Sequence, residues 1–431
     1  MSRAVSPART AAIWVLSRCR RFDAWTQQTA ESARAKFSLS ERDAALCLRL
    51  CRSVLQNAAL LDWYISRFCS RSAEKLDPAV LDILRLGAAQ LLLTDRIPAS
   101  AAVNESVELA KRSAPGAAGL INAVLRSLER NKNALPDIPG PGTPRELSIR
   151  FSHPLWLCER LVSEYGYESA KAVLAADNTP PDLTVTANLC RTGAVSLSNR
   201  FRDAGLDASL SPLSDVSVRI VSAGAVAALP GYAEGDFFVQ DAAAATGVIA
   251  AHPEPGMRVL DLCSAPGGKS MLCAVLMGDR GEILACDLHA KKLSRVEENA
   301  SRLGLKSIRT MSADASEPPK VLRASFDLVI ADAPCSGLGV IRKKPEIRYK
   351  SPEDIAALPA VQLRILRGAA ECVKRGGTLL YSTCTILREE NEDVAASFLS
   401  EDSRFSLVAQ RTILPHEFGT DGFYYAVLRR S

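Results

Sequence analysis

Residues 256–278 read GMRVLDLCSAPGGKSMLCAVLMG, and this stretch decides the fold of the C-terminal half. The apolar run VLDLC leads into a turn that contains Gly267 and Gly268, and a helix-like segment follows. This order of strand, glycine-rich turn and helix is typical of a nucleotide cradle, in which glycines let the backbone approach a ligand and Pro266 stiffens the turn. The stretch lacks both GxxxxGK[ST] and GxGxxG, so a P-loop and a dinucleotide site are disfavoured.

Further apolar runs with the same pattern follow along the chain. They are EILACDL at 282–288, SIRTMS at 307–312, FDLVIAD at 326–332 and TLLYST at 378–383. Helix-like segments separate most of them, which predicts a doubly wound parallel sheet covered on both faces. We therefore expect a Rossmann-like α/β domain over residues 231–431.

The N-terminal third has a different texture. Apolar residues recur at helical spacing through residues 41–68, and Asp77-Pro78 opens another helix-like run. The segment 133–144, NALPDIPGPGTP, holds four prolines and two glycines and cannot continue a helix. We expect an all-helical domain over 1–140 and a small α/β module over 141–230, with strands in LTVTAN (183–188) and VSVRIVS (216–222) and a helix between them.

Composition narrows the class of protein. At 431 residues, with 47% hydrophobic and 23% charged residues, the chain has the balance of a globular protein of two or three domains. Its apolar runs are shorter than the roughly 18 residues that a membrane helix needs, so we expect a cytoplasmic protein. Twelve cysteines without a CxxC pair and only four histidines indicate reduced thiols and predict no metal site.

Charge is distributed unevenly. Residues 1–140 contain 20 Lys and Arg against 13 Asp and Glu, whereas acidic residues slightly outnumber basic ones in the remainder. Such a surplus is found on surfaces that bind polyanions, although a solvated helical surface would have the same composition. The charge of the helical domain therefore suggests a polyanion as its partner.

Two aspartates follow the glycine-rich turn at strand ends. Asp287 lies 20 residues after Gly267, where a carboxylate can accept both ribose hydroxyls of an adenosine ligand, and Asp314 can reach the adenine edge. Either aspartate alone is as consistent with a helix cap. An adenosine group without a pyrophosphate is what S-adenosylmethionine presents, so the sequence predicts this cofactor.

Two cysteines and a carboxylate end the next two strands. DAPCSG places Asp332 and Cys335 after one strand, and YSTCT places Cys384 after the other. Carboxyl ends of neighbouring parallel strands meet at one crevice, so we expect these groups to converge there. Carbon 5 of cytosine attacks a sulfonium methyl only after a thiolate has added to carbon 6. A helix N-terminus near residues 386–389 would lower the pKa of that thiol.

DLCSAPGGKS, DAPCSG and YSTCT, in this order, resemble the RNA cytosine-C5 methyltransferases that carry a cysteine in two motifs. The N-terminal segments ARTAAIWVL, DPAVLDILRLGAAQLL, IPASAAVNESVELAK and GLINAVLRSL resemble the NusB-type RNA-binding fold. The combination covers essentially the full chain and is similar to bacterial methyltransferases of 16S ribosomal RNA. FFVQDAAAA and GTDGFYYAVL agree with that resemblance.

The resemblance implies a role for each site residue. Cys384 is the nucleophile, Cys335 assists product release and Asp332 contacts N3 of the base. The implied cofactor contacts are Cys263, Ser264, Ala265, Pro266, Gly267, Gly268, Lys269, Asp287, Asp314 and Asp332. The chain departs from the family pattern at Ser264, Ser270, Lys344 and Thr186, the last two in positions where substrate contacts are expected.

The expected partner is RNA, 16S ribosomal RNA above all, with no DNA or membrane partner and a monomeric enzyme. Two alternatives stay open. Transfer RNA is a second possible substrate of the same chemistry, and an RNA-binding or antitermination factor without activity is a different class of protein. The presence of both cysteines and all the strand-end carboxylates favours the enzyme.

Overall fold

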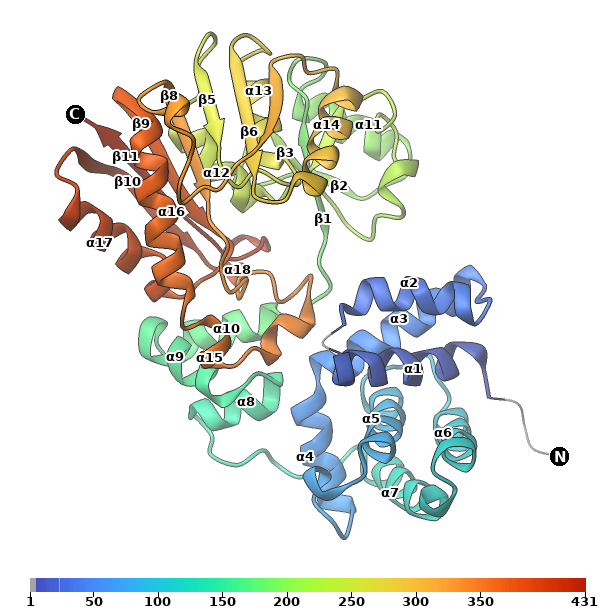
Figure 1. The fold of residues 1–431 in the computed structure, drawn as a ribbon. Coiled ribbons are helices and arrows are strands. Elements are labelled where there is room, and N and C mark those ends of the chain that lie inside the picture. Colours follow the sequence, from blue (N-terminus) through green and yellow to red (C-terminus); the bar gives the residue numbers. More distant parts are fainter. Residues whose placement is uncertain (1–4, 23) are drawn as a thin grey trace. The chain divides into compact units, whose positions relative to one another are not determined.

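The computed structural model describes residues 5–22 and 24–431, which form two compact units. The first unit runs to residue 178 and includes 344–350, and the second contains 179–343 and 351–431 (Figure 1). Arg3 and Asp23, which contribute to the charge count, lie outside the described residues. These two units are defined by contacts within the fold, whereas the domain boundaries at residues 140 and 230 were predicted from the sequence pattern. Those boundaries therefore remain a prediction.

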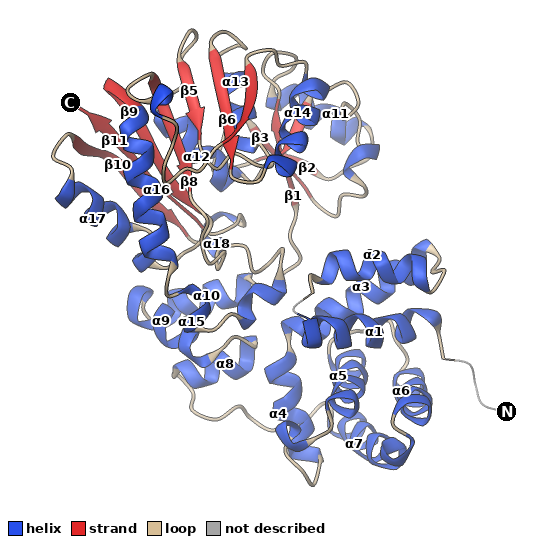
Figure 2. Ribbon diagram, viewed as in Figure 1, coloured by secondary structure: helices blue, strands red, loops and turns tan. Residues whose placement is uncertain are grey.

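The described part of the first unit is helical (Figure 2). Its α-helices are α1 (Pro7–Phe22), α2 (Thr26–Lys36), α3 (Glu41–Gln56), α4 (Ala58–Phe68), α5 (Pro78–Leu92), α6 (Ala99–Ser113), α7 (Ala118–Asn131), α8 (Pro144–Phe151), α9 (Leu155–Tyr165) and α10 (Tyr167–Ala176). The predicted start of α5 is confirmed, because the Asp77 carboxylate accepts a hydrogen bond from the backbone N–H of Ala79 at 2.8 Å.

Close packing of helices α5, α6 and α7 holds this unit together. A Cβ atom on Gly87 would lie 2.6 Å from a Leu125 methyl and 2.8 Å from the Ser106 hydroxyl. Glycine at position 87 therefore lets three helices approach one another more closely than any larger residue would allow. Ile83, Leu84 and Leu125 are fully buried in the resulting core.

The helix-like run at 41–68 is two helices, α3 and α4, bent by 76° at Asn57. The Asn57 side chain donates to the Ser53 carbonyl and the chain turns there. Among the described residues, no single helix is long and apolar enough to cross a membrane. The bent pair passes that test only when its two helices are taken together, by length and composition.

The second unit contains a small sheet with the strand order β2-β3-β1-β4, in which every pair is antiparallel. Its strands are β1 (Leu183–Ala187), β2 (Ala208–Leu210), β3 (Ser217–Ile220) and β4 (Phe237–Val239). Helix α11 (Ala194–Asp203) packs Leu197 and Phe201 against Val185, Val218 and Phe237. The two strands and the helix predicted for this module are confirmed, and β4 adds a strand from beyond residue 230.

The larger sheet of this unit has seven strands in the order β10-β11-β9-β8-β5-β6-β7. They are β5 (Arg258–Asp261), β6 (Glu282–Asp287), β7 (Ile308–Ser312), β8 (Phe326–Asp332), β9 (Val373–Thr383), β10 (Phe405–Ile413) and β11 (Phe423–Arg430). The five from β9 to β7 are parallel, as predicted. The order reverses on either side of β5, so the carboxyl ends of β5 and β8 border the crevice where such folds bind ligands.

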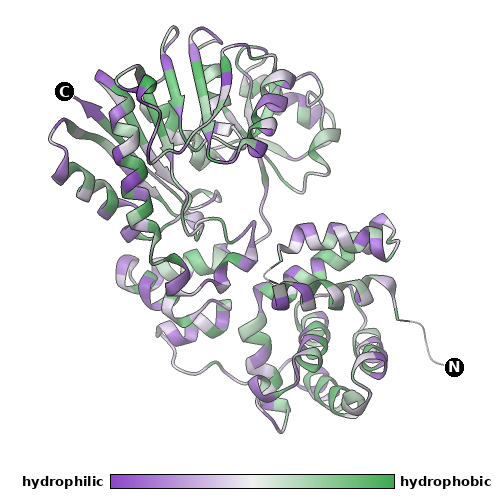
Figure 3. Ribbon diagram, viewed as in Figure 1, coloured by the Kyte–Doolittle hydropathy of each residue, from purple (hydrophilic) through white to green (hydrophobic). Residues whose placement is uncertain are grey.

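Helices cover both faces of this sheet. Leu328 and Ile330 point to the core formed with α12 (Ala242–Ala251), α13 (Gly268–Leu276) and α14 (Ala290–Leu303). Val329 and Ala331 point to the opposite core, formed with α16 (Leu358–Cys372) and α17 (Glu392–Glu401). Burial on both faces explains the nearly continuous apolar sequence of the central strands (Figure 3).

The last two strands differ from the expected all-parallel sheet. β11 runs antiparallel to both β9 and β10. A short connection that contains α18 (Pro415–Phe418) joins β10 to β11, and so short a link can only join antiparallel neighbours. As a result, residues 419–423 enter the sheet beside the end of β9, where Cys384 follows.

The short segment 344–350 belongs to the helical unit although it lies between β8 and α15 (Pro352–Ile355). The Arg348 guanidinium is fully buried and donates to the backbone carbonyls of Gln56, Phe151 and Ser152 and to the Asn178 side chain. Lys344, one of the departures from the family pattern, stacks 5.3 Å above the Trp25 ring in the same unit. This segment ties the chain that follows Cys335 into the helical core.

Candidate active site

The glycine-rich turn connects β5 to α13 as predicted. Gly267 has a φ of +105°, and a Cβ there would lie 3.1 Å from the Met271 side chain and 3.2 Å from that of Val296. Glycine is required at 267 for its backbone conformation and for packing inside the protein, in addition to any ligand contact. The turn is closed by the Gly267 N–H, which donates to the Ser264 carbonyl at 2.6 Å.

Buried polar atoms line this turn. The hydroxyl of Ser264 and one carboxylate oxygen of Asp261 are buried and have no hydrogen-bond partner within the described chain. The other Asp261 oxygen accepts from the Ser270 hydroxyl at 2.6 Å. Burial raises the pKa of Asp261 to about 7. Unsatisfied polar groups beside a glycine turn fit a polar ligand that supplies the missing hydrogen bonds.

Asp287 and Asp314 follow β6 and β7. One oxygen of Asp287 accepts from the His289 N–H at 2.9 Å, and one oxygen of Asp314 accepts from the Ser316 N–H and hydroxyl at 2.8 and 2.7 Å. Such hydrogen bonds cap a turn. Capping is the role that the sequence analysis gave as the alternative to a cofactor contact. In each carboxylate they use only Oδ1, so Oδ2 can accept from a ligand hydroxyl or amine.

The two predicted cysteines meet. The sulfur of Cys335, after β8, lies 3.3 Å from the sulfur of Cys384, after β9, and both thiols are free. The hydrogen bond from Cys335 lowers the pKa of Cys384. The same hydrogen bond, together with burial, raises the pKa of Cys335 well above its usual value. Within the pair, Cys384 is the residue whose pKa is lowered and Cys335 the residue whose pKa is raised.

Asp332 is held in place from two sides. Its Oδ2 lies 2.6 Å from the Lys269 ammonium, and its Oδ1 accepts from the Ser382 hydroxyl at 2.8 Å. The positive charge of Lys269 also favours the thiolate of Cys384 and is 5.1 Å from the Phe423 ring centre. Sequence placed Lys269 only among the cofactor contacts. The structure shows in addition that its side chain contacts the Asp332 carboxylate and acts on Cys384.

The prediction of a helix N-terminus at 386–389 is wrong. Residues Arg388–Glu390 form a single 3-10 turn, and α17 begins only at Glu392. The turn is needed to bury the Glu390 carboxylate, which accepts from the Ser336 N–H at 2.8 Å and the Gln362 amide at 2.9 Å. The lowered pKa of Cys384 has its main cause in Cys335 rather than in a helix dipole.

Sequence reasoning did not identify the residues that hold the two cysteine loops in place. Glu390 fixes the loop after Cys335, and Gln362 also donates to the Pro334 carbonyl at 3.1 Å. Asn391 donates to the Thr385 carbonyl at 3.1 Å and accepts from the Thr383 hydroxyl. The available signal was the acidic and amide run REEN directly after YSTCTIL, because such residues are seldom buried unless they are bonded.

Comparisons with known proteins agree with this geometry. Residues 248–429 match the family described as 16S rRNA methyltransferase RsmB/F, residues 6–130 the NusB family, and residues 153–227 the ferredoxin-like domain of RsmF/B-like methyltransferases. The fold and the site define an S-adenosylmethionine-dependent methyltransferase that acts on cytosine in RNA.

Relatives along nearly the full chain make the assignment specific. "Probable ribosomal RNA small subunit methyltransferase B" of Bacillus subtilis is 35% identical over 413 residues, which cover 91% of this chain and 92% of the relative. "Ribosomal RNA small subunit methyltransferase B" of Klebsiella pneumoniae is 36% identical over 402 residues, covering 90% and 91%. The chain belongs to the RsmB/F family of 16S rRNA methyltransferases. Fold class, cofactor and RNA chemistry are thereby confirmed, and 16S rRNA is favoured over transfer RNA and over a non-catalytic factor.

Solved structures share the fold. The crystal structure of PH0851 superposes with a TM-score of 0.80 at 24% identity and covers all of both chains. The crystal structure of NSun6 from Pyrococcus horikoshii with SFG covers 64% of this chain and 98% of its own, with a TM-score of 0.58 at 21% identity. The fold of the chain is therefore shared with known proteins.

Proposed function

We propose that Cys384 is the nucleophile with which this enzyme methylates carbon 5 of a cytosine in 16S rRNA. The observation that carries the proposal is the 3.3 Å contact between Cys384 and Cys335, in which the pKa of Cys384 is the lowered one. A thiolate at Cys384 can add to carbon 6 of the ring and make carbon 5 nucleophilic. The methyl group that carbon 5 accepts comes from S-adenosylmethionine.

Asp332 and Lys269 support this addition. Electron density moves toward N3 of the base when the thiolate adds to carbon 6. In our proposal N3 gains a proton from water as this charge develops, and its N–H donates to the Asp332 carboxylate. The ammonium of Lys269, 2.6 Å from Asp332, balances the charge of that carboxylate. Because Ser382 holds the other oxygen of Asp332, the carboxylate is oriented before RNA binds.

Cys335 is proposed to assist release of the methylated base, the step in which carbon 5 loses its proton to water and the electron pair of the C6–S bond returns to Cys384. Its sulfur lies 3.3 Å from the sulfur whose bond to carbon 6 must break at that stage. Its raised pKa keeps it protonated while Cys384 attacks, so the two thiols do not compete for the base. The roles of attack and release are thus divided by one hydrogen bond.

The cofactor would be held by the glycine-rich turn and the strand-end carboxylates. Cys263 through Lys269 surround the buried, unpartnered Ser264 hydroxyl. The remaining oxygen of Asp287 would accept the ribose hydroxyls and that of Asp314 the adenine amine. We further propose that the enzyme works as a cytoplasmic monomer with RNA as its partner and with neither DNA nor membranes.

A covalent-trapping experiment tests the two cysteine roles. With Cys335→Ala, the bond from Cys384 to RNA forms and persists, so a denaturant-resistant protein–RNA complex is expected on a gel after incubation with RNA and S-adenosylmethionine. With Cys384→Ala, no complex is expected. The opposite pattern would reverse the roles, with Cys335 as the attacking residue.

A calorimetric titration tests the cofactor site. Asp287→Ala removes an acceptor of two hydroxyl hydrogen bonds, and hydrogen bonds to a charged group contribute roughly 1.5 to 3 kcal/mol each, so affinity for S-adenosylmethionine should fall at least about tenfold. The exposed Asp215, changed to Ala, is the matched control. Unchanged affinity of the Asp287 variant would show that this carboxylate only caps the turn at His289.

A further inference from the structure

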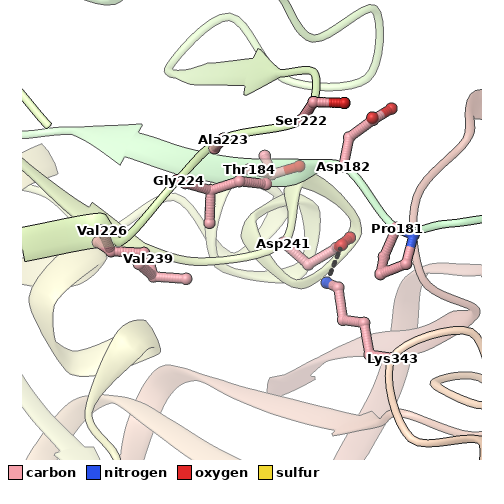
Figure 4. Close-up of a pocket in the computed structure, with 11 residues that line it drawn as sticks. Pro181, Asp182, Thr184, Ser222, Ala223, Gly224, Val226, Val239, Asp241 and Lys343 are labelled. Atoms are coloured by element: carbon pink, nitrogen blue, oxygen red, sulfur yellow. Dashed lines mark hydrogen bonds and ion pairs between the residues drawn. The ribbon is translucent and has the colours of Figure 1, made fainter. Parts of the chain in front are cut away.

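A pocket of about 360 Å³ lies in the second unit, between β1, the 222–226 loop and Lys343 (Figure 4). Its volume falls in the range of roughly 300 to 1,000 Å³ that is usual for small-molecule sites. Leu183, Val226 and Val239 form an apolar wall, and Val239 remains 53% exposed there. Asp241 and Lys343 close one end with polar groups (Figure 4).

The polar end of this pocket is a partly buried ion cluster, in which the Lys343 side chain remains 33% exposed. The Lys343 ammonium lies 2.7 Å from a carboxylate oxygen of Asp241 and 2.7 Å from one of Asp421. An ammonium has three N–H donors, so one remains after these two contacts. The Asp421 N–H donates to Asp241, and the second oxygen of Asp421 is buried without a partner within the described chain. Burial raises the pKa of Asp421 to about 7.

Three backbone contacts connect this cluster to the nucleophile. Gly422, next to Asp421, donates its N–H to the Gly339 carbonyl at 2.7 Å. The Gly339 N–H donates to the Cys384 carbonyl at 3.0 Å. A Cβ on Gly339 would lie 2.2 Å from the Gly422 oxygen, so the two backbones are in direct contact. The pocket and the cysteine pair are therefore connected through the ion cluster and two backbone hydrogen bonds within the same unit.

Charge decides what kind of ligand fits. The ionisable groups at the polar end are two carboxylates and one ammonium, which disfavours a phosphate. A nucleobase has two apolar faces for the wall of Leu183, Val226 and Val239, and its edge carries both acceptors and N–H donors. The remaining Lys343 donor suits a ring carbonyl or ring nitrogen. Asp182 at the rim, whose Oδ2 is paired with Arg219 at 2.6 Å, presents its Oδ1 to an amino group.

We propose that this pocket binds one unstacked nucleobase of the substrate RNA, from a nucleotide that flanks the target cytosine. Sequence-specific RNA recognition commonly holds unstacked bases in this way, by contact with a base face and hydrogen bonds to its edge. The inference rests on RNA as the substrate of Cys384. In this proposal the pocket selects the correct cytosine by binding the base of a neighbouring nucleotide.

The test uses two pocket variants and one control. Gly224 lines the pocket, and a Cβ there meets nothing within 4 Å, so Gly224→Trp adds bulk at the pocket without strain in the surrounding chain. Val239→Asp places a charge on the apolar wall. Gly193 also has nothing within 4 Å of a Cβ, and Gly193→Trp is the matched control away from the pocket. Calorimetry with S-adenosylmethionine confirms that each variant retains a folded cofactor site.

The substrate is a 16S rRNA fragment that contains the target cytosine in unmethylated form. In each of six further copies, one of the three nucleotides on either side of that cytosine is abasic. With wild-type enzyme, an abasic change at one flanking position should lower kcat/KM roughly tenfold, as is typical for loss of one bound base. Both pocket variants should show a similar loss on intact RNA and no further loss with that abasic copy, whereas Gly193→Trp should behave as wild type.

Two results would overturn the proposal. The first is a normal kcat/KM of both pocket variants on intact RNA. The second is that the abasic copy lowers kcat/KM in both pocket variants as much as it does in the wild-type enzyme. Failure of the proposed function gives a different outcome, because wild-type enzyme would then methylate none of the fragments in a Cys384-dependent way. The two failures are therefore distinguishable.

Discussion

Two pairs of cysteines, Cys47 with Cys51 and Cys335 with Cys384, show the same effect of a hydrogen bond on their pKa values but lie in different surroundings. Cys47 and Cys51 lie one turn apart on α3. The hydrogen bond between them lowers the pKa of Cys47 and raises the pKa of Cys51. Cys335 and Cys384 show the same division between two loops. A paired thiol by itself is therefore no sign of a reactive site.

The difference lies in the neighbours of each pair. Cys47 and Cys51 are 1% and 0% exposed within the apolar core of the helical unit. Cys384 has Lys269 and Asp332 beside it and is only partly buried. A thiolate needs a compensating charge and access to substrate, and only the second pair has both. Reactivity thus follows from the edge of the sheet where the pair lies.

The largest expected effect is on turnover, which should be lost after a change at Cys384 and kept after a change at Cys47. Cys384→Ser should lower turnover by about a thousandfold or more, because the serine hydroxyl is not ionised at neutral pH, and should leave cofactor binding intact. Cys47→Ser should keep turnover per folded molecule. Methyl transfer to 16S rRNA from a labelled cofactor measures both. Appreciable activity of the Cys384 variant would remove the assignment of the nucleophile.

The charge beside the pair is tested by Lys269→Met. Loss of one preorganised charged group from an active site commonly lowers the rate by about a hundredfold or more, and a loss of that order is expected in kcat. The pKa of Cys384 should rise as well, because the positive charge that favours its thiolate is gone. Lys291→Met, an exposed lysine in the same unit, is the control. A normal rate would mean that Lys269 is only a packing residue.

The hydrogen bond within the pair is tested by pH. A lowered pKa means that the Cys384 thiolate persists at lower pH than an ordinary thiolate, and Cys335→Ala removes the main cause of that lowering. The pH midpoint for alkylation of Cys384 by iodoacetamide should therefore move upward in this variant. Peptide mass spectrometry follows the residue separately from other thiols. The midpoint should stay in place in Cys51→Ala, and an unchanged midpoint in both variants would contradict the hydrogen-bond cause.

The smallest effect on activity is expected for changes at Cys47 and Cys51, which should alter the free energy of unfolding instead of turnover. Cys51→Ser buries a hydroxyl in an apolar core, which commonly costs about 1 to 3 kcal/mol of unfolding free energy. Urea unfolding measures this loss, with Cys51→Ala as the variant that adds no polar atom. Methylation per folded molecule should be unchanged in both. Loss of activity without loss of stability would show that the helical pair has a role in catalysis.

The sequence determined much of this site because its motifs are local. The glycine turn, the strand-end aspartates and the positions of Cys335 and Cys384 after their strands all follow from short runs whose period and turn residues are readable in one dimension. The convergence of the two cysteines also followed, because parallel strands end at one edge of a sheet.

Only the tertiary structure decided which groups touch the cysteines. The Lys269 side chain reaches Asp332. The Glu390 carboxylate accepts from the Ser336 N–H and so joins two loops that lie 54 residues apart in the sequence. The burial of Arg348 among carbonyls of the helical unit is equally absent from any local pattern. Contacts of this kind depend on where distant segments pack, and side-chain direction is fixed by that packing rather than by the neighbours in sequence.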